Sequence, residues 1–127
     1  KAGSHISDGG QQYYYSPRDI ADIANGYRPS IREAPLVEGH PATDEPSKGW
    51  VERLEATPDG RLLMKAKQVD PAFADGVKAG RFKKRSASFY PPDHPNNPNP
   101  GKWYLRHVGW LGAQQPAISG LRDVGFA

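Results

Sequence analysis

The segment FKKRSASFY places two serines, Ser86 and Ser88, one residue apart behind three cations and ahead of two aromatic residues. A serine hydroxyl becomes a nucleophile only when a neighbouring base takes its proton, and that base usually needs a third group to orient it. Serines at alternating positions are also ordinary on the outward face of a strand. The segment by itself therefore leaves both interpretations open.

The four histidines supply candidates for the other two roles. His40 follows a predicted buried strand in VEGHPATDEP, where a glycine and a proline fix a sharp corner, and such rigid corners are typical positions for catalytic groups. His107 lies within a strand of large apolar residues, where a buried imidazole needs partners for both ring nitrogens. Taken singly, His40 could be a turn residue and His107 a hydrogen-bonded core residue. We expect His5 and His94 to be solvent-exposed.

Other chemistries have less support in the sequence. The chain has no cysteine, which excludes disulfides, Cys-based zinc sites and a thiol nucleophile. It has no HExxH motif and no histidine pair at helical spacing, so neither a metal site nor any cofactor is expected. The Gly-rich stretches SDGGQQ and NNPNPG lack the lysine of a phosphate loop, and the absence of GxSxG excludes an α/β-hydrolase.

Length and composition indicate one domain, rich in turns, that is processed or excised from a longer polypeptide. The chain has 127 residues and begins with Lys1 rather than Met. Glycine and proline are abundant, which favours short strands over a helical bundle. No apolar run approaches the ~20 residues of a membrane span and no signal peptide is visible, so an intracellular protein is expected.

The net charge of +3 has a local origin. Five cations lie within residues 78–85: Lys78, Arg81, Lys83, Lys84 and Arg85. Such a cluster can attract an acidic protein or nucleic acid, or it can be a solvated strand edge. Nucleic-acid binding is not favoured as the main activity because no set of exposed aromatic residues is interleaved with these cations.

Two helices are predicted from caps and periodicity. The first, SPRDIADIANGY, has Ser16 as N-cap, an apolar face that includes Ile20 and Ile23, and Gly26 as a left-handed end. The second, DPAFADGVKAG, starts at Asp70 and closes at Gly80.

The remaining periodic segments predict strands. Residues 34–41 read as a short buried strand, and residues 48–56 and 61–69 flank the turn TPDG, which predicts an antiparallel hairpin. Residues 81–90 and 102–113 form two more strands, of which the last has apolar groups on both faces and should be central. Between these two, residues 91–101 predict an exposed, mobile loop. The fold class is mainly β with flanking helices, as a small closed or partly closed β-barrel.

Five motifs in fixed order resemble a known family. They are APLVEGHP, GWVERL, FKKRSASFYPP, LRHVGWLGAQQPAISGL and the closing VGFA, and the opening KAGSHISDGGQQYYYSPRDIADIANGY is also similar. This ensemble resembles the Mu-like phage capsid maturation protease, the prophage I protein family, which is related to tailed-phage prohead proteases and herpesvirus assemblins. The resemblance spans residues 1–127 and implies one serine protease domain on an assemblin-type barrel. A scaffold-like segment that commonly follows this domain in the family is expected to be absent here.

The resemblance also implies site residues and partners. Ser86 of KRSASFY matches the nucleophile because relatives place an aromatic residue three positions later, and Ser88 on the same face is the alternative. His40 of EGHP matches the base, and His107 of LRHVGWLGA matches a third member that is an acid in many phage enzymes. Backbone amides near Ser86 are the expected oxyanion donors, and Arg122 is a further candidate.

The implied activity is endoproteolysis of the chain itself and of the internal scaffold inside a prohead in the host bacterial cytoplasm. Scaffold and capsid proteins would be the substrates, and the basic run before Ser86 would attract an acidic scaffold partner. Dimerisation controls activity in some relatives, although no stretch of this chain indicates an interface. The alternative function is a non-enzymatic assembly module that binds scaffold or capsid protein with the same barrel.

Overall fold

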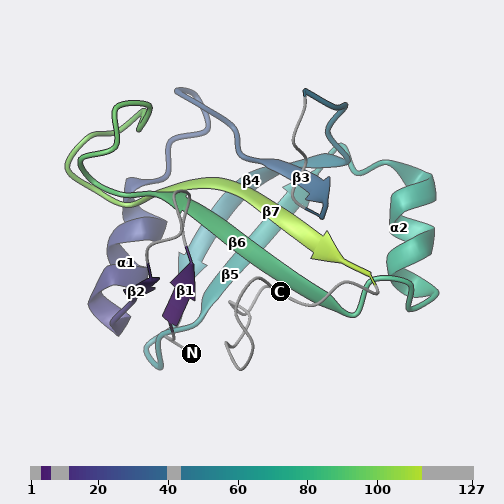
Figure 1. The fold of residues 1–127 in the computed structure, drawn as a ribbon, viewed down its shortest axis with the longest axis horizontal. Coiled ribbons are helices and arrows are strands. Elements are labelled where there is room, and N and C mark those ends of the chain that lie inside the picture. The colour runs from purple at the N-terminus through teal and green to yellow at the C-terminus, as the bar shows by residue number, and fades with distance from the viewer. Residues whose placement is uncertain (1–3, 7–11, 40–43, 113–127) are drawn as a thin grey trace.

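The computed structural model describes residues 4–6, 12–39 and 44–112, with side chains from Tyr15 onward. This part of the chain contains seven strands and two helices, so it is mainly β (Figure 1). The strands are β1 (Ser4–Ile6), β2 (Gln12–Tyr14), β3 (Pro35–Glu38), β4 (Gly49–Ala56), β5 (Leu62–Lys67), β6 (Lys84–Tyr90) and β7 (Tyr104–Leu111). The helices are α1 (Pro17–Gly26) and α2 (Pro71–Lys78). In the described residues, neither helix is long and apolar enough to cross a membrane.

Five strands form one mixed sheet in the order β5-β4-β3-β7-β6, and it curves into a half-barrel (Figure 1). Three of its four pairings are antiparallel, whereas β3 and β7 run parallel. The other two strands, β1 and β2, pair antiparallel as a separate small sheet. The prediction of a mainly β fold with flanking helices is confirmed, and the half-barrel is consistent with a partly closed barrel.

Helix α1 begins as its sequence predicts. The Ser16 hydroxyl accepts from the Asp19 amide (3.1 Å), and the Asp19 carboxylate accepts from the Ser16 amide (3.0 Å), which completes a capping box. Ile20 and Ile23 are buried on the face that packs on the sheet. The predicted left-handed end at Gly26 is wrong: Gly26 is the last helical residue, and a Cβ there would lie 3.1 Å from the Lys102 side chain. Close packing explains this glycine.

Helix α2 also follows its predicted signals. The Asp70 carboxylate accepts from the Phe73 amide (2.9 Å), and Gly80 ends the segment with φ of +80°, which glycine adopts without strain. Phe73 is buried and contacts Phe82 and Trp110, with ring centroids 5.5 and 5.4 Å away. Because Phe82 packs here, β6 begins at Lys84 rather than at residue 81 as predicted.

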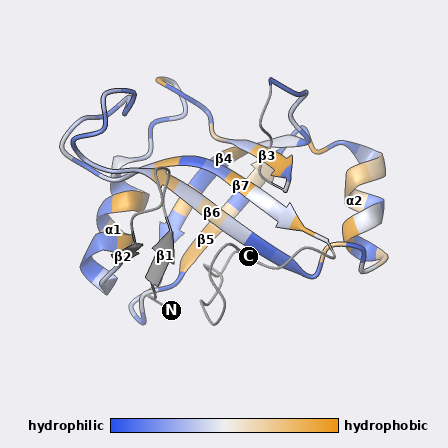
Figure 2. Ribbon diagram, viewed as in Figure 1, coloured by the Kyte–Doolittle hydropathy of each residue, from blue (hydrophilic) through white to orange (hydrophobic). Residues whose placement is uncertain are grey.

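The strand predictions hold for the central sheet. β4 and β5 form the expected antiparallel hairpin, and β7 pairs on both sides, with β3 and β6. Figure 2 shows apolar residues concentrated on strands of the sheet and on the helices, whereas the loop between β6 and β7 is hydrophilic. The largest fully buried side chains are Tyr104, Phe89, Ile20, Ile23, Leu36, Leu62, Leu105, Val51 and Val108. The β1–β2 pairing was not predicted, because its glycine-rich surroundings hid the short strands.

The loop of residues 91–101 contains no helix or strand, as predicted, but it is not the freely exposed loop that its composition indicated. Asn97 is only 5 % exposed, and its amide group donates to the carbonyls of Pro91 (2.9 Å) and Lys102 (2.7 Å). Its Oδ1 atom accepts from the Asn99 amide, and the Asn99 side chain donates to the Gly26 carbonyl (3.0 Å). Side-chain amides therefore tie the loop to itself and to α1.

Replacing Asn97 with alanine should lower the free energy of unfolding by about 2 kcal/mol, because three hydrogen bonds are lost and two carbonyls lose a donor. Chemical denaturation of the purified variant measures this change. Asn96→Ala is the matched control, since Asn96 is exposed. Equal stability of the two variants would contradict the anchoring role of Asn97.

Candidate functional site

Two of the predicted catalytic residues, Ser86 and His107, share one face of the sheet with the alternative nucleophile, Ser88. Ser88 of β6 pairs directly with His107 of β7, and Ser86 pairs with Gly109. Residues two apart in a strand point to the same side, so Ser86, Ser88 and His107 lie on a common face. Directly paired residues have Cβ atoms about 5 Å apart, whereas diagonal neighbours such as Ser86 and His107 are separated by roughly 7 Å.

A β-bulge lies beside this arrangement. Ser88 pairs with His107, but the next residue of β6, Phe89, pairs with Leu105. Arg106 is therefore an extra residue in β7, and the register changes at that point. Bulges of this kind redirect side chains and are over-represented next to active sites.

The third strand that approaches the site is β3. Val37 pairs with Gly109, the same residue that pairs with Ser86. These three residues therefore lie in one row across the adjacent strands β3, β7 and β6. Beyond β3 the Gly39 amide donates to the Trp110 carbonyl (2.8 Å), and Gly39 has φ of +64°, which turns the chain. His40 is the next residue in sequence, but it lies outside the described residues, as does Arg122.

The exposure of the candidates differs from expectation in two places. Ser86, Ser88 and His107 are all half-buried, so His107 is not the fully buried imidazole that its apolar strand indicated. His94 was expected to be exposed, and it is instead half-buried: its ring lies 5.1 Å from that of Tyr90, and its Nδ1 atom accepts from the Asn96 amide (3.0 Å). The side chain of His5, in β1, lies outside the described part.

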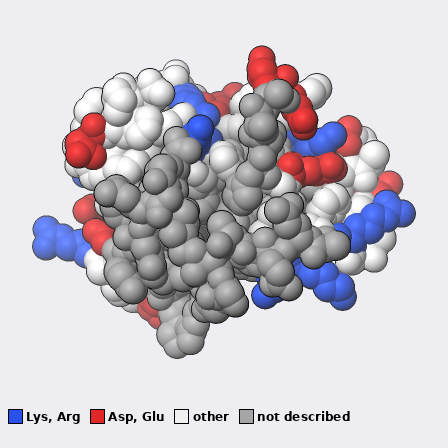
Figure 3. All heavy atoms as spheres, in the orientation of Figure 1, with Lys and Arg blue, Asp and Glu red and all other residues white. Residues whose placement is uncertain are grey.

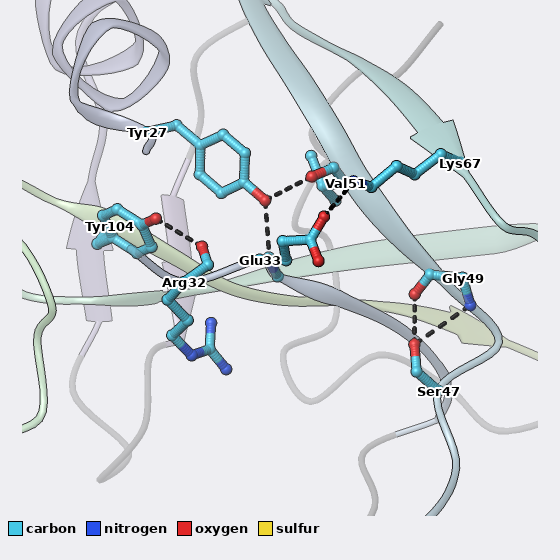
Figure 4. Close-up of polar contacts among 9 residues, drawn as sticks. Tyr27, Arg32, Glu33, Ser47, Gly49, Val51, Lys67 and Tyr104 are labelled. Carbon is cyan, nitrogen blue, oxygen red and sulfur yellow. Dashed lines mark hydrogen bonds and ion pairs between the residues drawn. The ribbon is translucent and has the colours of Figure 1, made fainter. Parts of the chain in front are cut away.

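Two buried tyrosines fix the chain between α1 and β3 (Figure 4). The Tyr27 hydroxyl donates to the Val51 carbonyl (2.6 Å) and accepts from the Ala34 amide (2.9 Å). The Tyr104 hydroxyl accepts from the Arg28 amide (3.2 Å) and lies within 2.8 Å of the Arg28 carbonyl. Burial raises the pKa of Tyr27 to about 12 and also raises that of Tyr104. Both phenols therefore stay protonated as donors.

An ion pair links β5 to the same chain segment between α1 and β3. Lys67 of β5 pairs with Glu33, the residue that precedes Ala34 and β3 (Figure 4). The hydrogen bond from Lys67 to Glu33 raises the pKa of the lysine. These contacts fix the direction in which the chain enters β3, and hence the strand that leads to His40.

The predicted basic segment, residues 78–85, packs against helix α2 through Phe82. Lys78, Arg81, Lys83 and Lys84 are exposed, and Figure 3 shows basic side chains at the lower right, over α2 and the start of β6. The segment is held by Phe82: a Cβ on Gly76 would lie 3.2 Å from the Phe82 ring. The cations thus lead directly into the strand that carries both serines.

A surface depression and possible metal-binding clusters were the other candidate sites among the described residues. A depression of about 330 Å³ lies on the β4–β5 hairpin and contains none of the predicted residues. It is lined by Arg53, Glu55, Leu63, Met64, Lys65 and Ala66. Within residues 4–6, 12–39 and 44–112, no three His, Asp or Glu side chains gather closely enough to hold a metal ion.

Sequence reasoning missed the bulge at Arg106 and the glycine that lies opposite Ser86. One signal for the bulge was present: Tyr104 and Leu105 are adjacent large apolar residues, which breaks the alternation expected of a regular strand. Comparisons of this chain with protein-family models, with curated proteins and with solved structures find no match.

Proposed function

We propose that this chain is a serine endopeptidase that cleaves itself and the internal scaffold of a phage prohead during capsid assembly. Ser86 is the nucleophile, His40 the general base and His107 the residue that orients His40. The observation that supports this best is the common face of β6 and β7, which carries both serines and His107. The substrate, the prohead location and the assemblin-type barrel follow from the resemblance of the sequence motifs to Mu-like prohead proteases.

The register favours Ser86 over Ser88 as the nucleophile. Ser86 pairs with Gly109, which pairs with Val37 near the end of β3, and His40 follows that end by two residues. Gly109 has no side chain, so nothing from β7 stands between Ser86 and β3. Ser88 lies two residues further from the end of β3, opposite His107.

The proposed chemistry proceeds in two stages. His40 accepts the Ser86 hydroxyl proton while the serine oxygen attacks the scissile carbonyl carbon, and His40 then returns the proton to the leaving amine. Water hydrolyses the acyl-enzyme by the same route. His107 holds His40 in the useful tautomer, but a neutral imidazole stabilises the imidazolium of His40 less than a carboxylate does, so turnover should be slow.

The basic segment provides a reason for selecting an acidic partner. It carries +5 within residues 78–85, whereas the whole chain carries +3, so the remaining residues together carry −2 (3 − 5). Opposite charge is therefore attracted to this segment, which runs into β6 and Ser86. An acidic stretch of the scaffold polypeptide would be brought to the nucleophile in this way.

The direct test is intact-mass spectrometry after treatment with a fluorophosphonate, applied to the wild type, Ser86→Ala and Ser88→Ala. One adduct on the wild type and on Ser88→Ala, but none on Ser86→Ala, is the expected result. An adduct lost only in Ser88→Ala would retain the protease and move its nucleophile. No adduct on any of the three proteins would contradict the enzyme and favour the non-enzymatic assembly module.

Charge reversal of the basic segment should weaken substrate capture. The double variant Lys83→Glu, Lys84→Glu is expected to lower kcat/KM about tenfold on an acidic protein substrate at low salt, and the difference should shrink towards 0.5 M NaCl. The control carries the same change in net charge at two distant exposed cations, Arg18→Glu and Lys65→Glu. Equal losses in the two double variants would show that only net charge matters.

A further inference from the structure

Arg32 connects the segment between α1 and β3 to three successive residues of β7. Its backbone carbonyl accepts from the Tyr104 hydroxyl (2.7 Å; Figure 4). Its Nη1 atom donates to the carbonyls of Leu105 (3.3 Å) and Arg106 (2.9 Å). Arg32 therefore contacts the three residues of β7 that directly precede His107.

The bulge in β7 is the reason that His107 faces the serines. Phe89 pairs with Leu105, so in a regular antiparallel ladder Ser88 would pair with Arg106, and His107 would pair with Ala87. Ala87 is buried in the hydrophobic core. The extra residue Arg106 shifts the register by one position and moves His107 from the core face to the serine face.

Arg32 supplies the hydrogen bonds that such an irregularity requires. A bulge leaves its extra residue outside the ladder, and buried or half-buried carbonyls there need a donor. The guanidinium of Arg32 donates to both carbonyls at the bulge, and a charged donor makes stronger hydrogen bonds than a neutral one. The regular ladder would pair Arg106 with Ser88 and so place the Arg106 carbonyl differently, away from the Arg32 guanidinium.

The Arg32 side chain is itself fixed by β6. Its guanidinium carbon lies 5.5 Å from the ring centroid of Tyr90, within the range of a cation–π contact. In Figure 4 the side chain points away from Tyr27 and Glu33, so it takes no part in the Glu33–Lys67 ion pair. Arg32 is thus held between the two strands that carry the serines and His107.

We infer that Arg32 is a positioning residue: it stabilises the β7 bulge and thereby keeps His107 opposite Ser88, on the face that carries Ser86. The catalytic consequence of this inference rests on the proposed serine-protease function. The structural consequence, the proximity of His107 to Ser88, does not depend on activity and is measured separately.

The test compares two replacements of similar length. Arg32→Met keeps an unbranched side chain but loses the charge and cannot donate. Arg32→Lys keeps one charged nitrogen, and a single nitrogen makes both bonds in the wild type. Arg28→Met is the matched control, because Arg28 lies in the same segment and its side chain donates to carbonyls at the end of α1, not to β7. Sucrose stabilises folded chains without restoring a donor, so it keeps Arg32→Met folded for the assays.

Two readouts are taken on each variant. The first is the nuclear Overhauser effect between the His107 ring and the Ser88 β-protons, assigned with His107→Gln. The second is the rate of fluorophosphonate labelling. We expect Arg32→Met to lose the Overhauser effect and to be labelled roughly 10- to 100-fold more slowly, since small displacements cost such factors. Arg32→Lys should stay within about threefold of the wild type, because its ammonium group can still donate to both carbonyls.

An unchanged Overhauser effect in Arg32→Met would overturn the inference, whatever the labelling rate. Loss of the effect in Arg28→Met as well would also overturn it, because the change would then reflect the whole segment. A wild type that shows the Overhauser effect but takes no label would contradict the proposed protease alone, and the comparison of Arg32→Met with Arg32→Lys would still decide the positioning role.

Discussion

Ser86→Ala is expected to lower the rate of peptide cleavage by roughly 10⁴-fold or more, because its hydroxyl is the proposed nucleophile and alanine cannot form an acyl-enzyme. The same change should alter the free energy of unfolding by less than about 0.5 kcal/mol. Ser86 is half-buried, and its strand pairing with Gly109 uses backbone atoms that alanine retains. A large loss of activity with an unchanged fold distinguishes a nucleophile from a structural residue.

The measurement uses peptides from a digested bacterial lysate as substrates, with new termini quantified by mass spectrometry. Ser88→Ala is the matched control, since Ser88 has the same chemistry, the same strand and similar exposure. We expect Ser88→Ala to retain cleavage within about tenfold of the wild type, because a neighbour that only packs against the site contributes little to the transition state. Cleavage by Ser86→Ala at the wild-type rate would refute the assignment.

Tyr27→Phe should lower the free energy of unfolding by about 2 kcal/mol at neutral pH. The phenol donates to Val51 and accepts from Ala34, and phenylalanine leaves that carbonyl and that amide without their partner. Urea denaturation measures the loss. Tyr90→Phe is the control, because Tyr90 contacts its neighbours through the ring, which phenylalanine keeps.

The same substitution should reduce the loss of folding stability at alkaline pH. The Tyr27 pKa is about 12 in the folded chain against 10.0 ordinarily, so the folded state holds this proton more tightly. The resulting stabilisation is complete below pH 10 and is lost as the pH rises from 10 to about 12. Between these values the wild type should lose more stability than Tyr27→Phe does, although the raised pKa of Tyr104 keeps some slope in both. Parallel curves would contradict this role of Tyr27.

The sequence predicted those elements whose signals are local. Ser16 and Asp70 are caps with short polar side chains, and TPDG is a turn, so α1, α2 and the β4–β5 hairpin could be located from a few neighbouring residues. Gly26 shows the limit of this approach. Its position resembles a helix end, but its role depends on Lys102, which lies far away in sequence.

The candidate site depends on contacts between residues that lie far apart in the sequence. The residue types Ser86 and His107 could be selected from the sequence, but their common face follows from a register that includes an extra residue, Arg106. Strand alternation alone cannot reveal that register, because a bulge is stabilised by a donor from elsewhere, here Arg32. For the same reason the loop of residues 91–101 looked mobile until the hydrogen bonds of Asn97 were known.

The parallel ladder between β3 and β7 has a consequence for the order of synthesis. Residues 39–103 separate these two strands, and their pairing is the only described ladder that joins the first half of the sheet to β6 and β7. During translation β3, β4 and β5 emerge long before β7, so the face that carries the serines cannot meet β3 until β7 has left the ribosome. The proposed protease site therefore forms only after β7 has left the ribosome and paired with β3.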